Sequence, residues 1–175
     1  MDEITECVLK AQKGDKNAFG ILYKQYYSRI YRYCCINLYQ NQAAEDICQE
    51  VFIRAWKALP RFTIRNEGTF QAFLFRIARN LIIDLSRKKK VISIDNVGEI
   101  SKDDNLVEGI SRKEDIARVK NALGKLNDID KQIIILRYFE ELSHSESAKI
   151  LHMKEGALRV RTIRLLKKLK EIIEK

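Results

Sequence analysis

Apolar residues recur every three or four positions through most of the chain, which is the spacing of amphipathic helices. No stretch shows the alternating, β-branched pattern of strands, and the chain has only 7 Gly and 1 Pro. The third predicted helix ends at Pro60, which cannot continue it. In the first half, helices are expected at about residues 4–14, from just after residue 15, at 42–59 and at 70–89. The chain is therefore expected to be all-α.

The second half of the chain predicts a helix-turn-helix. Ser143 is a good N-cap, and Glu146, three residues later, completes a capping box. His152 stands where such turns usually place glycine in the left-handed conformation, which histidine tolerates better than most side chains. Helices are expected at about residues 116–125, 128–139 and 145–151, and a longer basic helix follows the turn at 152–154. The second helix of such a motif enters the major groove of DNA.

The long basic helix EGALRVRTIRLLKKLK has apolar residues on two opposite faces. One apolar stripe should pack on the rest of the domain. It consists of Leu158, Leu165, Leu166, Leu169 and Ile172. The opposite face should meet base edges, where arginine pairs with guanine and branched apolar side chains touch thymine methyl groups. It consists of Arg159, Val160, Ile163 and Arg164, flanked by Arg161 and Lys168 at positions suited to phosphates. The alternative is a solvated basic helix with two exposed apolar residues, which are common on surfaces.

Between the two halves, residues 91–115 lack a sustained helical period and mix Gly, Ser, Asn and Asp. They predict a flexible linker of about 25 residues, which joins two small helical domains at 1–90 and 116–175. The formal charge of +9 divides into +7, −4 and +6 over these three segments in chain order. Two basic domains around an acidic linker indicate two surfaces for a polyanion, although an anionic membrane surface also fits the composition.

The run AEDICQEVFIRAWKAL places acidic and polar residues on one side of the third helix. Four of them recur at spacings of three and four and so share a face. They are Asp46, Gln49, Glu50 and Ile53. An acidic stripe on a basic domain suits a protein partner better than DNA. The alternative interpretation is a solvated face. Trp56, the only Trp in the sequence, is expected in the core.

The fourth helix and the preceding polar loop, RFTIRNEGT, combine basic and aromatic residues. This combination can hold single-stranded nucleic acid, with Arg and Lys on the backbone and bases in the loop. The aromatic residues Phe70, Phe73 and Phe75 are assigned to the core instead. The basic cluster of Arg79, Arg87 and residues 88–90 is the stronger functional candidate.

Several kinds of chemistry find no support in the sequence. It has no phosphate-binding glycine loop, no nucleophile elbow and no metal-ligand spacing, so we expect no catalytic role, metal, cofactor or small-molecule substrate. The 4 Cys form no C-x-x-C pair and are expected to be reduced thiols, and His144 and His152 lack an acidic or thiol cluster. No apolar run approaches the roughly 20 residues of a membrane span. The acidic N-terminus differs from a signal peptide, so a cytoplasmic location is expected.

Taken together, these motifs resemble a known family. The runs that carry the resemblance are GDKNAFGILYKQYYSRIYRYC, AEDICQEVFIRAWKAL, FQAFLFRIARNLIIDLSRKKK, LNDIDKQIIILRYFEELSHSESAKIL and EGALRVRTIRLLKKLK. They are similar to bacterial RNA polymerase sigma factors of the extracytoplasmic-function (ECF) type, group 4 of the sigma-70 family. The most specific signals are D-x-x-Q-E-x-F-x-x-x-W from Asp46 and R-I-A-R-N-L-x-x-D from Arg76.

The resemblance implies a protein that binds core RNA polymerase and directs it to promoters, while the polymerase performs the chemistry. It implies that domain 1–90 is sigma region 2 and binds the polymerase β′ clamp helices, with β as a further contact, through Asp46, Gln49, Glu50 and Ile53. The −10 element would be recognised by Arg61, Asn66, Arg76, Arg79, Asn80, Arg87 and Lys88. Domain 116–175 would be region 4 and bind the −35 element through Arg159, Val160, Arg161, Ile163, Arg164 and Lys168. An anti-sigma factor is a further expected partner.

Three residues depart from the family pattern. Ser147 replaces an apolar residue of the first helix-turn-helix element, Lys154 stands where Ser commonly caps the recognition helix, and Val160 stands where Ser is common. They bear on the −35 preference and leave the expected fold unchanged. Two other functions stay open at this point: a helix-turn-helix repressor or activator with an extra helical domain, and a helical adaptor on a membrane surface. A pull-down with core RNA polymerase would discriminate among the three.

Overall fold

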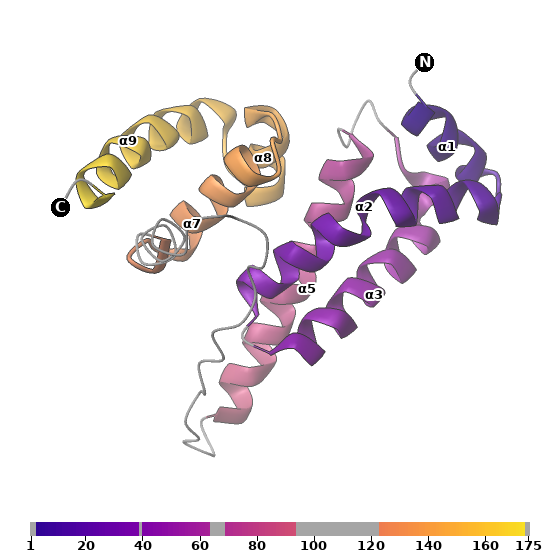
Figure 1. Cartoon of the computed structure of the whole chain (residues 1–175), viewed down its shortest axis with the longest axis horizontal. Coiled ribbons are helices and arrows are strands. Elements are labelled where there is room, and N and C mark those ends of the chain that lie inside the picture. Colours follow the sequence, from indigo (N-terminus) through magenta and orange to yellow (C-terminus); the bar gives the residue numbers. More distant parts are fainter. Residues whose placement is uncertain (1–2, 39, 64–68, 94–122, 174–175) are drawn as a thin grey trace. The chain divides into compact units, whose positions relative to one another are not determined.

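The computed structural model describes residues 3–38, 40–63, 69–93 and 123–173. Within these ranges the chain forms helices and no strand, which confirms the all-α prediction. The chain divides into two compact units, Met1–Asp104 (unit 1) and Asn105–Lys175 (unit 2). The helices of unit 1 are α1 (Glu3–Gln12), α2 (Lys16–Asn37), α3 (Asn41–Ala58), η1 (Leu59–Arg61) and α5 (Phe70–Ser93). Those of unit 2 are α7 (Asp128–Ile134), η2 (Ile135–Phe139), α8 (His144–Leu151) and α9 (Glu155–Ile173) (Figure 1).

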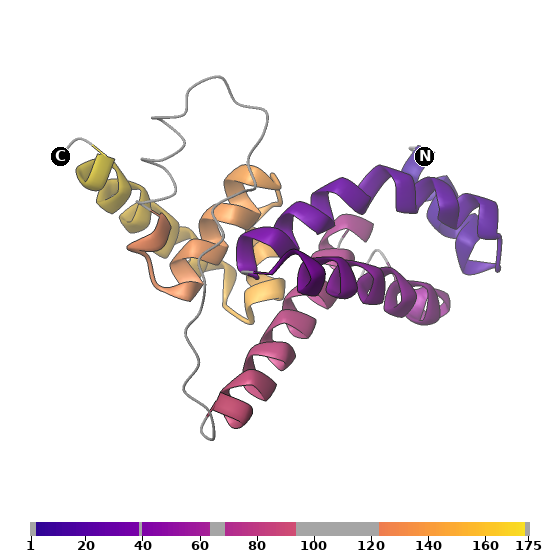
Figure 2. The same cartoon turned by 60° about the horizontal axis from the view of Figure 1, so that its bottom comes forward.

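In unit 1, α2 packs against α1, α3 and α5, while α3 and α5 also pack against each other (Figure 2). Asp15 caps α2, because its Oδ1 accepts hydrogen bonds from the backbone N–H groups of Asn17 and Ala18 at 2.9 and 3.1 Å. Burying a large apolar side chain contributes roughly 1.5–3 kcal/mol to folding. The largest fully buried side chains of this unit include Leu22, Ile30, Tyr33, Leu74 and Phe75.

Aromatic contacts fix the direction of α5 relative to α2. Tyr26 meets Phe70 with ring centroids 5.7 Å apart, and Tyr33 meets Phe75 at 5.2 Å. Because residue numbers rise together along both helices, α2 and α5 run parallel. The three aromatic residues predicted to lie in the core, Phe70, Phe73 and Phe75, are all buried. The basic residues of α5 are therefore left on its outer side.

Side-chain hydrogen bonds join α1 to the end of α3. Nε2 of Gln12 donates to the backbone carbonyl groups of Leu59 and Phe62, at 3.1 and 2.6 Å. Carbonyl groups at the end of a helix have no donor within the helix, so an external side chain can satisfy them. Helix α1 thereby holds the turn η1, from which the chain proceeds toward α5.

Unit 2 contains the helix-turn-helix that the sequence predicts. Oγ of Ser143 accepts the N–H of Glu146 at 3.1 Å, and Oε2 of Glu146 accepts the N–H of Ser143 at 3.0 Å. The predicted capping box is thus present at the start of α8. His152 ends α8 in the left-handed conformation, with φ 54° and ψ 43°. The turn leads into α9, the predicted basic helix.

Some predicted limits differ from the structure. Helix α5 continues to Ser93, past the domain limit predicted at residue 90. Most of the predicted linker 91–115 and of the helix at 116–125 lies outside the described residues, so the domain limits stay a prediction.

The buried seam of α9 also differs from the predicted one. Leu166 is predicted to be buried but is 41% exposed. Thr162 is buried instead, and its Oγ1 donates to the carbonyl of Leu158 at 2.8 Å. Thr162 follows Leu158 by four residues and precedes the buried Leu165 by three, which is the spacing of a narrow packed seam. Leu166 falls outside this seam because it is one residue, or about 100°, away from Leu165.

Candidate functional site

The predicted protein-binding residues of α3 lie together on one exposed strip. Asp46, Gln49 and Ile53 are exposed, Glu50 is half-buried, and the Ile53 side chain has 47% of its surface in solvent. Oε1 of Glu50 accepts a hydrogen bond from Nε of Arg54 at 2.7 Å, which restrains the carboxylate. We call the residues Asp46, Gln49, Glu50 and Ile53 the acidic strip.

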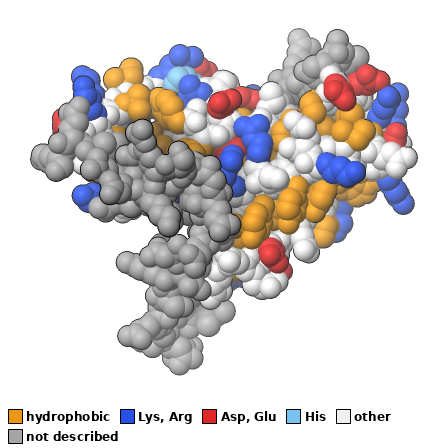
Figure 3. All heavy atoms as spheres, viewed as in Figure 1, with side chains coloured by type: hydrophobic (Ala, Val, Ile, Leu, Met, Phe, Trp, Pro, Cys, Tyr) orange, Lys and Arg blue, Asp and Glu red, His pale blue; other side chains and the backbone are white. Residues whose placement is uncertain are grey.

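An open apolar groove runs beside the acidic strip, between α2 and α3. Its volume is about 430 Å³, and it is lined by Phe19, Tyr23, Gln49, Phe52, Ile53, Trp56 and Lys57. Trp56 is half-buried and edge-on to Phe19 with ring centroids 4.9 Å apart, so its predicted place in the core is wrong. Tyr23 and Phe52, from the two helices, lie 4.7 Å apart between ring centroids. Figure 3 shows hydrophobic side chains gathered on this surface over α2 and α3. We call this feature the aromatic groove.

A row of tyrosines extends from the aromatic groove along α2. The ring centroids of Tyr23 and Tyr27 are 5.2 Å apart, and those of Tyr27 and Tyr31 are 6.0 Å apart. A hydrogen bond with the thiol of Cys35, together with burial, raises the pKa of Tyr31 to about 12. The phenol is therefore neutral at physiological pH, and the row adds apolar surface without charge. Helical spacing alone does not distinguish these partly exposed aromatic residues from core residues, so the sequence did not predict this row.

The residues predicted for the −10 element lie mainly on α5. Arg76 and Arg79 are half-buried, while Asn80, Arg87 and Lys88 are exposed. The guanidinium of Arg76 lies 5.8 Å from the centroid of the Phe73 ring, within the range of a cation–π contact. Arg61 is exposed at the end of η1, and Asn66 lies outside the described residues. Five of the seven residues predicted to bind the −10 element therefore lie on α5.

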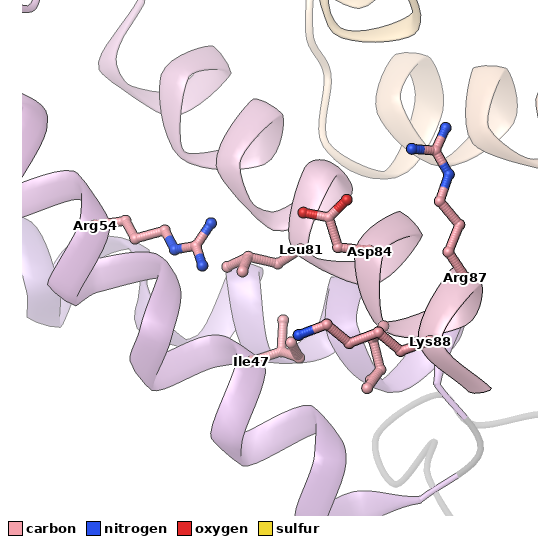
Figure 4. Close-up of a pocket in the computed structure, with 7 residues that line it drawn as sticks. Ile47, Arg54, Leu81, Asp84, Arg87 and Lys88 are labelled. Carbon is pink, nitrogen blue, oxygen red and sulfur yellow. The ribbon is translucent and has the colours of Figure 1, made fainter. Parts of the chain in front are cut away.

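A second groove, which the sequence did not predict, separates α3 from α5. It has a volume of about 380 Å³ and is lined by Ile47, Arg54, Leu81, Asp84, Leu85, Arg87 and Lys88 (Figure 4). Three of its seven lining residues are cations and one is an acid. We call it the basic groove. The sequence did not reveal this groove, because Arg87 and Lys88 lie more than 30 positions from Arg54.

On α9, the predicted DNA-reading face is open to solvent. Val160 and Ile163 are 50% and 60% exposed, and Arg159, Arg164 and Lys168 are exposed as well. Oε1 of Glu155 accepts a hydrogen bond from the guanidinium of Arg159 at 2.6 Å, one turn earlier on the same helix. The apolar pair therefore stands among cations on a surface that unit 2 leaves uncovered.

Arg161 takes a different place from the one predicted. Its Nε lies 2.6 Å from Oδ1 of Asp130 on α7, and its guanidinium also donates to Oδ1 of Asn127 at 3.3 Å. Asp130 is buried, with 9% of its surface exposed. This pairing argues against the phosphate contact predicted for Arg161, because the guanidinium is already used to neutralise a buried carboxylate.

Two features of unit 2 concern the departures from the family pattern. Ser147 is fully buried, and its Oγ has no hydrogen-bond partner among the described residues. Lys154, directly before α9, is exposed, and its carbonyl accepts the N–H of Leu158 at 3.0 Å. Ser147 thus places in the core a hydroxyl that no described residue satisfies, and Lys154 lacks the side-chain oxygen that a Ser cap would supply.

The remaining reactive groups do not form a chemical centre. All four thiols are free, and burial raises the pKa of Cys48 to about 12. In the part of the chain that the structure describes, no group of three or more His, Cys, Asp or Glu side chains could hold a metal ion. None of the helices described has both the length and the apolar character needed to cross a membrane.

Together, the two units define a helical protein that has basic surfaces on both units and a separate acidic strip on α3. Comparisons with known proteins agree with this class. Residues 22–91 match the family model for Sigma-70 region 2, and residues 116–169 match that for Sigma-70, region 4. The chain is 32% identical to the ECF RNA polymerase sigma factor SigW of Bacillus subtilis (strain 168), over 90% of each chain.

Two further comparisons extend over nearly the whole chain. It is 31% identical to the ECF RNA polymerase sigma factor BldN of Streptomyces coelicolor over 96% of its length, and spans 65% of BldN. The structure of CnrH in complex with the cytosolic domain of CnrY matches with a TM-score of 0.73 and 25% identity, covering 99% of this chain and 98% of CnrH. The chain belongs to the ECF sigma factors of the sigma-70 family, which direct RNA polymerase to promoters.

Proposed function

We propose that this sigma factor docks on core RNA polymerase through the acidic strip and the aromatic groove of unit 1. One observation carries this assignment: in a basic domain, the acidic strip lies directly beside an open groove lined by the exposed Tyr23 and Ile53 and the half-buried Trp56. Acidic side chains repel DNA, and partly exposed Trp and Tyr side chains are the residue types that contribute most to protein interfaces. The partner surface would be the β′ clamp helices, with β as a further contact.

The promoter would be bound by the basic surfaces of α5 and α9. On α5, the residues proposed for the −10 element are Arg76, Arg79, Asn80, Arg87 and Lys88, with Arg61 from η1 and Asn66 from the loop. On α9, the residues proposed for the −35 element are Arg159, Val160, Ile163, Arg164 and Lys168. Arg161 is left out of the reading face, because it holds α9 on α7. The protein would act in the cytoplasm, with no cofactor and no catalytic step of its own.

A second protein partner is an inhibitor of the anti-sigma class. The solved relative CnrH is bound to the cytosolic domain of another protein, CnrY. An inhibitor that covers the acidic strip or the aromatic groove would keep the sigma factor from polymerase. The alternative of a repressor or activator would need no polymerase-binding surface, so it leaves the exposed aromatic residues of α2 and α3 unexplained.

The test is co-elution of the full chain with core RNA polymerase. Glu50→Lys should weaken the complex at least tenfold, since a charged contact is worth about 1.5–3 kcal/mol and the new Lys would repel its partner. Glu6→Lys is the matched control, because Glu6 also pairs with a cation four residues later at 2.7 Å but lies on α1. Trp56→Ala should likewise weaken binding. If Glu50→Lys co-elutes as well as Glu6→Lys, the acidic strip is not the docking surface.

A further inference from the structure

The basic groove between α3 and α5 has the composition of a site for a phosphate-bearing ligand. Its cations come from two helices: Arg54 from α3, and Arg87 and Lys88 from α5 (Figure 4). Asp84 is the one carboxylate among its lining residues. All four of these charged residues are exposed, so a ligand could reach each without unfolding the unit.

Arg54 retains capacity for a further acceptor. An arginine side chain has five N–H donors, and Nε of Arg54 uses one of them on Oε1 of Glu50 at 2.7 Å. Figure 4 shows the guanidinium extending from α3 toward Leu81 on α5, into the groove. The ion pair with Glu50 restrains the guanidinium, so less side-chain entropy is lost when an anion binds.

The floor of the groove is apolar. It consists of Leu81, which is buried, and of Ile47 and Leu85, which are half-buried. A volume of about 380 Å³ lies at the lower end of the range for ligand pockets. A floor of this kind can contact a sugar or the face of a base, while the cations at the rim bind a phosphate.

We propose that the basic groove is a nucleotide subsite for a DNA strand bound by α5. Arg54 binds one phosphate together with Lys88, whose side chain also extends toward Ile47 (Figure 4), and the sugar or base of that nucleotide lies on Leu81 and Leu85. The inference rests on the proposed function, since Arg87 and Lys88 belong to the surface assigned to the −10 element. It adds a contact from α3 to a surface otherwise built from α5, η1 and the intervening loop.

Continuity favours a DNA strand over an acidic protein segment or a free nucleotide. Arg87 and Lys88 line the groove and also belong to the basic outer side of α5, so a strand that follows α5 arrives at the edge of the groove that contains Arg54. Arginine binds phosphate more readily than lysine does, because its planar guanidinium can donate two parallel hydrogen bonds. Asp84 would lie near the same phosphate, so its negative charge opposes binding.

Two substitutions test the inference, one that should weaken DNA binding and one that should strengthen it. The measurement is binding of preassembled polymerase complex to a forked DNA with an exposed −10 strand, at several salt concentrations and at saturating core polymerase. Arg54→Gln should weaken binding about tenfold, the size of one charged hydrogen bond. It should also reduce the slope of log affinity against log salt by about 0.7, as expected for one phosphate of a single strand. Asp84→Asn should strengthen binding about two- to fivefold, because it removes the opposing charge.

The matched control is Lys10→Gln. Lys10 pairs with Glu6 at 2.7 Å, just as Arg54 pairs with Glu50, and it is an exposed cation on α1 outside the groove. It removes the same net charge, so an unchanged affinity in this variant shows that the loss in Arg54→Gln is local. Arg54→Lys, which keeps the charge without the planar fork, should recover part of the affinity and most of the salt slope.

Three outcomes would overturn the inference, and they separate it from the proposed function. If Arg79→Gln weakens DNA binding while Arg54→Gln and Asp84→Asn do not change it, the α5 surface stands and the subsite does not exist. If none of the three changes binding, both the subsite and the −10 surface on α5 are wrong. A loss of polymerase co-elution in Arg54→Gln with unchanged DNA binding would also overturn the subsite, and would limit Arg54 to positioning Glu50.

Discussion

Arg161 on α9 and Asp130 on α7 form an ion pair with Nε and Oδ1 2.6 Å apart, across 31 positions of sequence. Their side chains are 39% and 13% exposed, so the carboxylate is the more buried partner. Asp130 also accepts a hydrogen bond from Nδ2 of Asn127 at 2.8 Å. The pair fixes the rotation of α9 about its own axis, and so determines which residues of α9 face outward.

Arg161→Ala should destabilise unit 2. Breaking a fully buried ion pair costs roughly 3–5 kcal/mol, and the partial exposure of Arg161 lowers our expectation to about 2 kcal/mol. Trp56, the only Trp, lies in unit 1, so Trp fluorescence reports that unit while circular dichroism reports both. Urea unfolding should show an earlier transition by circular dichroism and an unchanged one by fluorescence. Arg164→Ala, at an exposed position, is the control. Equal stability of the two variants would mean that the ion pair is not a structural contact.

Ser147→Ala should stabilise unit 2 by about 1 kcal/mol. The substitution removes a buried hydroxyl that has no hydrogen-bond partner within the described part of the chain, and Ala also has the higher helix propensity. The measurement is the midpoint of urea unfolding by circular dichroism. Ser145→Ala, at an exposed position of the same helix, controls for propensity alone. A loss of stability in Ser147→Ala would show that the hydroxyl has a partner in solution, such as a bound water.

Substitutions on the predicted DNA-reading face of α9 should distinguish residues that contact bases from residues that contact phosphates. Arg164→Ala should cost about 1–3 kcal/mol at one base position and relax specificity there, whereas Lys168→Ala should weaken binding to all sequences and reduce the salt dependence. Val160→Ser should alter discrimination at a thymine-containing step. The measurement is binding of the full chain to a panel of −35 variants at two salt concentrations. If Arg164→Ala weakens binding to all −35 variants equally, Arg164 contacts a phosphate and not a base.

Unit 1 should lose stability in alkaline solution. Burial raises the pKa of Cys48 from 9.0 to about 12, so the folded state holds this proton more tightly than the unfolded state. The resulting stabilisation is complete below pH 9 and is lost as the pH rises toward 12, at up to about 1.4 kcal/mol per pH unit. Trp56 fluorescence during urea unfolding at pH 8 and pH 10.5 measures the effect. Cys48→Ala should reduce this dependence, and the Cys34 thiol, whose pKa burial also raises, should keep the remainder. Parallel pH profiles for the wild-type and Cys48→Ala chains would contradict the prediction.

The features predictable from the sequence are the local ones. Ser143 and Glu146 stand three residues apart, so their capping box could be recognised without the fold. The exposure of Val160 and Ile163 followed from helical period alone. By contrast, Arg161 and Arg164 look alike on a basic helix, and only the distant Asp130 distinguishes them.

The two grooves depend on packing and could not be predicted. Periodicity marked Trp56 as apolar, but its partial exposure depends on how closely α2 approaches α3. The presence of Arg54 and Asp84 in one groove likewise follows from the packing of α3 on α5, which no local pattern encodes.

The hydrogen bonds from Gln12 have a practical consequence for protein engineering. Because its side chain holds the carbonyl groups of Leu59 and Phe62, the first helix is tied to the turn that leads toward α5. Trimming α1 to obtain a smaller fragment, or fusing a tag that unwinds its last turn, would leave both carbonyl groups without this donor. Affinity tags and fluorescent fusions are therefore better placed after α9.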